Sequence, residues 1–148
     1  MTTVRPILDT DLDPVLKMIH ALAAHHGDAA VITKDTLARD ALGAVPWLHV
    51  LVAEGARGLV GYAALCPLAQ LQFGVRGMDM HHLFVAPDMR GRGLGRRLTQ
   101  ASVAHARDLG CRYLTVGTHP DNHGAAAAYR AMGFAARPAP GPRFSLRW

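Results

Sequence analysis

Residues 90–95 read Arg-Gly-Arg-Gly-Leu-Gly, and this stretch decides the fold more than any other part of the chain. Glycines let a backbone turn sharply and approach an anion closely. The first amides of a helix are free to donate hydrogen bonds and lie at the positive end of its dipole. Short loops also collect glycine and arginine for solvation alone, so the neighbouring sequence has to decide whether this turn binds phosphate.

The flanking segments predict a strand before the turn and a helix after it. Residues 78–85 have the length and composition of a strand, and Pro87 ends its pairing. From Leu94 to Leu109 apolar residues recur at helical spacing, and Gly110 stands where a C-terminal cap belongs. The order is therefore strand, loop, anion-binding turn and helix.

Two familiar phosphate motifs are excluded. A P-loop needs Gly-Lys followed by Ser or Thr, whereas Gly95 is followed by Arg96 and Arg97. A dinucleotide fingerprint needs G-x-G-x-x-G with an acidic residue about 20 positions further on. This chain has G-x-G-x-G and only Thr115, Val116 and Gly117 near that point.

The turn instead resembles the acetyl-CoA signature of the GNAT superfamily of N-acetyltransferases, [Gln/Arg]-x-x-Gly-x-[Gly/Ala], matched at Arg90, Gly93 and Gly95. Residues 122–134 resemble that family's later motif, in which Asn and Tyr flank small residues and Gly-Phe follows. The closest motif spacing is that of the diamine and polyamine acetyltransferases. The resemblance covers nearly the whole chain and implies acetyl-CoA as co-substrate.

The resemblance also implies a cofactor site. A splayed fourth strand would leave a backbone edge along which pantetheine adds, with an N–H that stabilises the oxyanion of the thioester. The residues expected to bind the cofactor are Leu83, Phe84, Val85, Arg90, Gly91, Arg92, Gly93, Leu94, Gly95, Arg96, Asn122, Ala125 and Ala126.

Tyr129 matches the family's general acid. Asn122 and Tyr129 are seven residues apart, which is two helical turns, so both face the same side of a helix. The alanines between them let a cofactor lie close. A phenol with a pKa of about 10 stays protonated at neutral pH and can protonate a leaving thiolate. A buried core tyrosine is the alternative.

The acceptor side departs from the family pattern. Where polyamine-type relatives carry an acidic pair, this chain has His81 and His82. A histidine is a competent base near neutral pH, so His81 is the candidate base, with a structural histidine as the alternative. Asp79 projects to the same side as His81 if the strand is regular. Because imidazoles do not attract a polycation as carboxylates do, polyamines become less favoured acceptors.

Further substrate contacts are expected from the loop after the first helix, which borders the acceptor pocket in this superfamily. The residues expected to contact the acceptor are His25, His26, Asp28, Asp79 and His82. The pairs His25-His26 and His81-His82 cannot each put both rings on one face of a regular element, which argues against a metal site.

Composition is consistent with a single acetyltransferase domain over residues 1–148, expected in the cytoplasm. No apolar run is long enough to span a membrane, and two cysteines do not make a disulfide framework. The net charge of +5 suggests nucleic acid, but the arginines cluster only at the turn, so no nucleic-acid partner is expected. A homodimer is implied by the resemblance alone.

The expected fold is α/β, with a mixed, mostly antiparallel twisted sheet of six to seven strands, about four helices and a splayed central strand pair. Strands are expected at residues 2–8, 47–54, 59–66, 78–85, 112–118 and 143–148, and helices at 11–26, 33–42, 94–109 and 122–132.

Three functions remain open at this level. The first is acetyl transfer from acetyl-CoA directly to a primary amine of a small molecule, with a tyrosine as acid. The second is a peptide or protein N-acetyltransferase acting on an N-terminus or a lysine. The third, from another class, is a CoA-binding sensor or regulatory module without efficient catalysis.

Overall fold

The computed structural model describes residues 1–148, and their contacts divide the chain into two units, Met1–Gly117 and Thr118–Trp148. The first unit contains β1 (Thr3–Pro6), α1 (Leu12–His25), α2 (Lys34–Ala41), β2 (His49–Gly55), β3 (Gly58–Gln70), β4 (Val75–Val85), α3 (Leu94–Asp108) and β5 (Cys111–Val116). The second contains α4 (His123–Ala131). None of these helices is both long and apolar enough to cross a membrane.

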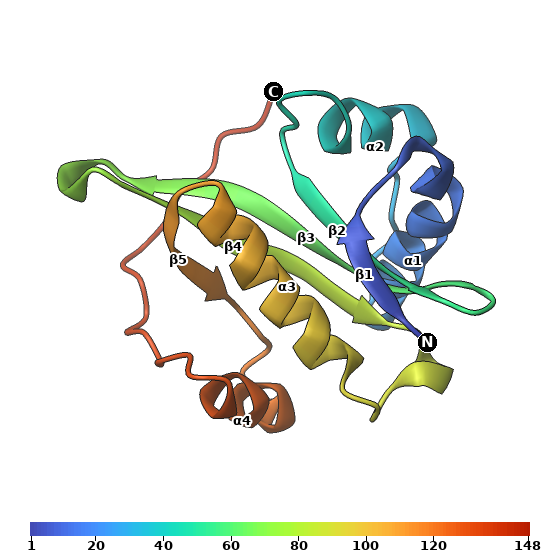
Figure 1. Cartoon of the computed structure of the whole chain (residues 1–148). Helices are drawn as coiled ribbons and strands as arrows, with labels where there is room; N and C mark the ends of the chain where they lie inside the picture. The colour runs from blue at the N-terminus through green and yellow to red at the C-terminus, as the bar shows by residue number, and fades with distance from the viewer. The chain divides into compact units, whose positions relative to one another are not determined.

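The first unit is built on one five-stranded sheet in the order β1-β2-β3-β4-β5 (Figure 1). Neighbours pair antiparallel from β1 to β4, and β4 pairs parallel with β5. The parallel pair follows from the crossover through α3, because parallel strands need a long connection. The mixed, mostly antiparallel sheet is thereby confirmed.

Helices cover both faces of this sheet. On one face, alternate strand residues such as Val50, Val52 and Tyr62 pack in one core with residues of α1 and α2. The residues between them, such as Leu51 and Ala63, are also buried and face the opposite side, which α3 crosses in Figure 1. A strand buried on both faces reads as a continuous apolar run, as β2 does.

A partly buried ion pair fixes the start of α1 against β1. The carboxylate of Asp11, just before α1, accepts two hydrogen bonds from Arg5, at 2.7 and 3.1 Å, and a third from the Leu8 amide at 2.8 Å. These bonds to Arg5 hold the pKa of Asp11 below its ordinary value. The brace sets the angle at which α1 enters the core.

The expectation of a sixth or seventh strand is wrong, because the sheet has five strands and residues 143–148 form none. Phe144, Leu146 and Trp148 alternate as in a strand, yet all three are exposed. The segment follows Pro138, Pro140 and Pro142, which have no amide hydrogens to give to a ladder. Alternation alone does not make a strand when no partner strand pairs with it.

The feature that positions the site is the divergence of β4 from β5. Their pairing runs from Arg76 opposite Cys111 to Met80 opposite Val116, whereas β4 continues to Val85. On its other side β4 stays paired with β3 as far as Val85 opposite Gly61. The last part of β4 therefore has one open edge. The expected splayed strand pair is present, but it lies at the end of the sheet and not at its centre.

Candidate functional site

The glycine-rich turn joins the open end of β4 to α3. Gly91 has φ 76° and Gly93, the N-cap of α3, has φ 80°, a left-handed conformation that favours glycine. The first hydrogen bond of α3 runs from the Arg97 amide to the Gly93 carbonyl at 3.0 Å. The amides of Leu94, Gly95 and Arg96 therefore have no helical partner and are available to an anion.

Arg90 ties this turn to the strand before it. Its Nε donates to the Val85 carbonyl at 2.9 Å, and its guanidinium lies 5.8 Å from the centre of the Phe84 ring. Sequence reasoning placed Arg90 among the cofactor contacts. The structure gives its Nε a different partner, so Arg90 organises the turn while the rest of its guanidinium stays exposed.

The open edge presents the backbone of Leu83 and Val85. The Ala86 amide bonds to the Val60 carbonyl of β3 at 2.8 Å. Along an antiparallel strand the backbone N–H and C=O groups of successive residues point alternately to one neighbouring strand and to the other side. The backbone groups of Phe84 therefore point to β3, and those of Leu83 and Val85 point away from it. The N–H groups of Leu83 and Val85 thus point to the side where β5 has separated, a suitable place for a thioester carbonyl or a pantetheine amide.

A β-bulge brings His81 and His82 together. Ala64 of β3 lies opposite His82 and Leu65 lies opposite Met80, so His81 is the extra residue with no partner. The two rings stack with centroids 4.3 Å apart and an angle of 18° between planes. In a regular strand they would point to opposite faces, so the bulge overturns the expectation that these rings separate.

His82 is anchored and His81 is exposed. Nδ1 of His82 lies 2.9 Å from the hydroxyl of Tyr62, whose side chain is fully buried. Burial and the neighbouring imidazoles of His81 and His26 lower the pKa of His82 to about 4. His82 is therefore neutral at physiological pH, and His81 is the ring that solvent reaches.

Asp79 is not the partner of His81. Its carboxylate accepts a hydrogen bond of 2.6 Å from the Thr115 hydroxyl on β5. Asp79 thereby joins β4 to β5 where they still pair, and no hydrogen bond links it to His81.

The loop after α1 contributes one residue to this cluster. His26 caps α1 and lies close enough to His82 to lower its pKa. His25 and Asp28 are exposed, and neither bonds to the His81-His82 pair. No group of three or more His, Cys, Asp or Glu side chains is arranged to hold a metal ion.

The second unit contains the remaining expected site residues. Asn122 caps α4, and its side-chain oxygen accepts from the Ala125 amide at 3.0 Å. Tyr129 lies in α4, where its ring meets Phe134 edge-on at 5.6 Å. Burial raises the pKa of Tyr129, so its phenol keeps its proton at neutral pH.

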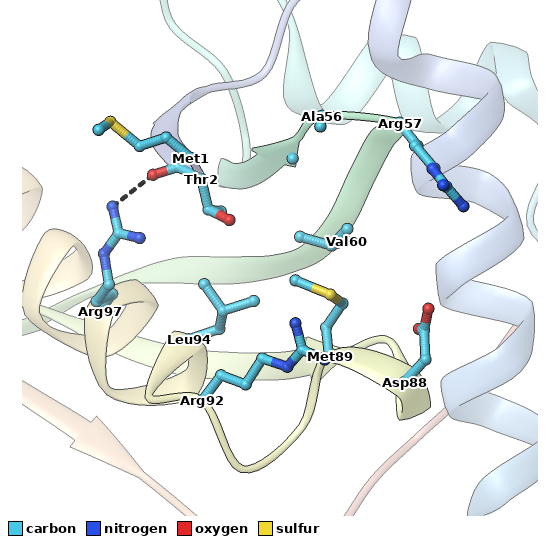
Figure 2. A pocket seen from close by; sticks show the side chains of 11 residues that line it. Met1, Thr2, Ala56, Arg57, Val60, Asp88, Met89, Arg92, Leu94 and Arg97 are labelled. Carbon is cyan, nitrogen blue, oxygen red and sulfur yellow. Dashed lines mark hydrogen bonds between the residues drawn. The ribbon is translucent and has the colours of Figure 1, made fainter.

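A cavity of about 500 Å³ lies on the β1 and β3 side of the turn (Figure 2). Its walls include three arginines, Arg57, Arg92 and Arg97, and a single carboxylate, Asp88. Arg97 donates to the Thr2 carbonyl at 2.7 Å, while Arg57 and Arg92 form no hydrogen bond. The side of the turn away from β5 is therefore also positively charged.

Sequence reasoning missed Tyr62 and Arg57. Tyr62 stands in an apolar run and looked like ordinary core, and no pattern of residues signals the bulge that brings His82 beside it. Arg57 lies on the hairpin between β2 and β3, distant in sequence from the turn. Only tertiary structure brings these residues to the site.

Known proteins share both the sequence pattern and the fold. The model of the acetyltransferase (GNAT) family matches residues 19–134. Thialysine N-epsilon-acetyltransferase of Bos taurus is 29% identical over 140 residues, covering 88% of this chain and 82% of the relative. The L-amino acid N-acyltransferase MnaT of Escherichia coli is 32% identical over 102 residues, covering 67% and 58%.

Solved structures agree at the level of fold. An aminoglycoside acetyltransferase from an uncultured soil metagenomic sample, in complex with sisomicin, has a TM-score of 0.82 at 17% identity, covering 99% of this chain and 97% of that one. Ribosomal-protein-alanine N-acetyltransferase of Brucella melitensis has a TM-score of 0.77 at 18% identity, with full coverage of both chains. Together with the family match over most of its length, these findings show that the chain belongs to the GNAT family and is an acetyl-CoA-dependent acetyltransferase.

Proposed function

We propose that the chain, as a single domain over residues 1–148, transfers the acetyl group of acetyl-CoA directly to a primary amine of a small molecule. The observation that carries this proposal is the open edge of β4, which runs without interruption into a turn with free helix amides. A pantetheine arm along the edge and a pyrophosphate on the turn would use both features of one continuous segment.

The proposed cofactor site follows from this placement. The amides of Leu94, Gly95 and Arg96 bind the pyrophosphate, with Gly91, Arg92 and Gly93 shaping the turn and Arg90 holding it to β4. The backbone along Leu83, Phe84 and Val85 binds pantetheine and polarises the thioester carbonyl. For Asn122, Ala125 and Ala126, the proposed role in cofactor binding rests on the resemblance of residues 122–134 to the family's later motif.

The proposed chemistry needs one base and one acid. The amine nitrogen attacks the thioester carbon after His81, directly or through water, has taken its proton, and the carbon–sulfur bond then breaks. Tyr129 gives its proton to the leaving thiolate, and the second proton that the attacking nitrogen must lose returns through water to the Tyr129 phenolate, which leaves free CoA and the N-acetyl amine. The raised pKa of Tyr129 keeps that proton in place until the thiolate forms.

Support for a small acceptor comes from the relatives. By their names, the bovine relative acts on thialysine and the Escherichia coli relative on L-amino acids. An enzyme of Pseudomonas aeruginosa that is 34% identical over 86 residues is named for L-methionine sulfoximine and L-methionine sulfone. All three are small amines, which favours this acceptor class over peptides.

A thiol-release assay with acetyl-CoA and a panel of acceptors tests the proposal. The panel contains amino acids, diamines, an aminoglycoside and short peptides with a free N-terminus or lysine. We expect release that depends on a small amine. Faster turnover of peptides would assign the second function, and binding of acetyl-CoA without release on any acceptor would assign the sensor.

A further inference from the structure

The hydroxyl of Tyr62 determines which nitrogen of His82 carries hydrogen. The hydroxyl is fully buried, and its one hydrogen bond in the structure is to Nδ1 of His82 at 2.9 Å. If Nδ1 carried the hydrogen, the phenol hydrogen would be buried without an acceptor, which is costly. The phenol therefore donates to Nδ1, and the neutral ring carries its hydrogen on Nε2.

The surroundings of His82 keep this form over a wide pH range. The titratable groups that face the ring are Tyr62 from β3, His81 from β4 and His26 from the end of α1. None of them is a carboxylate that would stabilise an imidazolium. Burial and the two neighbouring imidazoles lower the pKa of His82 to about 4, so the ring stays neutral.

The free nitrogen of His82 is directed away from Tyr62. The two nitrogens point in roughly opposite directions in the plane of an imidazole, so anchoring Nδ1 to the buried Tyr62 hydroxyl turns Nε2–H away from it. The exposed His81 stacks on the face of this ring at the bulge, and the pair lies immediately before the open edge of β4. A neutral N–H donor with a fixed direction thus stands beside the candidate base.

We propose that His82 determines acceptor specificity, its Nε2–H binding a carboxylate or similar oxygen next to the amine that is acetylated. This inference rests on the proposed function and narrows its acceptor to amines that carry such an oxygen, as amino acids do. The three imidazoles give no permanent negative charge to a polyamine, whereas a fixed donor favours an oxygen acceptor.

Matched acceptors and matched variants test the specificity. L-lysine and cadaverine differ only in the carboxylate, and we expect kcat/KM to be at least ~10-fold higher for lysine, the range of one hydrogen bond to a charged group. His82→Asn keeps an acceptor for the Tyr62 hydroxyl but removes the donor at the Nε2 position, so the preference should fall toward unity. His82→Gln places an amide N–H near the position of Nε2, so this variant should keep more of the preference for lysine over cadaverine than His82→Asn does.

The outcomes separate the inference from the proposed function. An equal preference for lysine in the wild type and His82→Asn overturns the role of His82 and leaves the acetyltransferase standing. Absence of acetylation of every amine in the panel overturns the proposed function and this inference with it.

A spectroscopic measurement tests the fixed donor without any substrate. Long-range proton–nitrogen correlation spectra of isotope-labelled histidine assign the tautomer of each ring. We expect His82 to remain the Nε2–H form from about pH 5 to about pH 8, across the range in which a free histidine titrates. Tyr62→Phe should abolish this fixed form. A His82 that carries hydrogen on Nδ1, or that titrates in this range, contradicts the inference.

Discussion

At the scale of single residues, the proposed reaction depends on two side chains with opposite tasks. Tyr129 must hold a proton until a thiolate forms, and His81 must accept one from an ammonium. The structure supplies the environment that each task needs, because Tyr129 is partly buried with a raised pKa while His81 is exposed. These roles lead to two tests.

Replacing Tyr129 should impair turnover more than cofactor binding. Tyr129→Phe removes the acidic hydroxyl and keeps the ring against Phe134, so we expect kcat to fall ~100-fold while the Kd of acetyl-CoA changes less than ~3-fold. Steady-state kinetics and calorimetry measure the two effects. Tyr113→Phe is the matched control, because the Tyr113 hydroxyl has no hydrogen bond, and it should keep wild-type turnover. An unchanged kcat in Tyr129→Phe excludes the acid role.

Replacing His81 should alter the pH dependence of the rate. We expect His81→Ala to lower kcat/KM ~100-fold and to change the pH profile of the rate, because the proposed base is removed. The exposed His20→Ala on α1 should leave the pH profile as it is. If His81→Ala keeps the wild-type profile, the base is another group.

His81 and His82 show what the sequence could not predict at this scale. The sequence places both in a strand next to the turn, and the structure confirms that placement. Their stacking depends on a bulge, which arises from pairing with β3 and has no signature in the residues themselves. The Asp79–Thr115 bond could not be assigned from the sequence either, because it depends on the register in which β4 pairs with β5.

At the scale of elements, the turn before α3 is the part whose backbone conformation the sequence predicts best. Two of its glycines adopt positive φ, which explains why glycine rather than alanine stands there. Gly95 differs, because it lies inside α3 and a Cβ at this position would meet nothing closer than Leu83 at 4.0 Å. Within this motif, Gly91 and Gly93 are therefore needed for their backbone conformation, whereas Gly95 is not.

A matched pair of alanine variants tests this distinction. Gly93→Ala forces a left-handed residue to carry a Cβ, so we expect a loss of about 1–2 kcal/mol in the free energy of unfolding and at least ~10-fold weaker binding of acetyl-CoA. Gly95→Ala should be neutral or stabilise by up to about 1 kcal/mol. Urea unfolding and calorimetry give both quantities. Equal effects of the two variants would contradict the assignment of the turn.

The prediction of strands from the sequence failed where a strand depends on pairing with a neighbouring strand. The residues 143–148 have the alternation of a strand, yet the preceding prolines and the absence of a paired neighbour leave them outside any sheet. The long hairpin of β3 and β4 was likewise drawn too short, because residues 67–77 lack a clear period. Pairing between strands, rather than propensity, decides both cases.

At the scale of the whole molecule, the two motifs and their separation identified the family, and the family model confirms it over residues 19–134. The chemical class of the acceptor was less predictable from the sequence, because the loop after α1 and the bulge in β4 shape the part of the site around His81 and His82. The stability of the first unit also depends on contacts between elements, such as the Arg5–Asp11 pair that joins β1 to the start of α1.

Stability against acid should depend on Asp11. Its pKa in the folded chain is lowered, so its contribution is present above the ordinary pKa of about 4 and is lost as pH falls through the folded value. We expect Asp11→Asn to be about 2 kcal/mol less stable at neutral pH and to lose less stability on acidification. Urea unfolding across pH measures this. The control is Asp40→Asn, in the exposed Arg39–Asp40 pair, which should show the same dependence of stability on pH as the wild type. If Asp11→Asn also shows the wild-type dependence, the stabilising role of the Arg5–Asp11 pair is contradicted.

The most direct test of the central claim follows the acetyl group itself. The enzyme is mixed with acetyl-CoA labelled at the acetyl carbon and with L-lysine, and both products are quantified by mass spectrometry. We predict labelled N-acetyl-lysine in equal amount to free CoA, with both absent when the enzyme is omitted. Free CoA without a labelled amide, or no consumption of acetyl-CoA with any primary amine, would contradict the account.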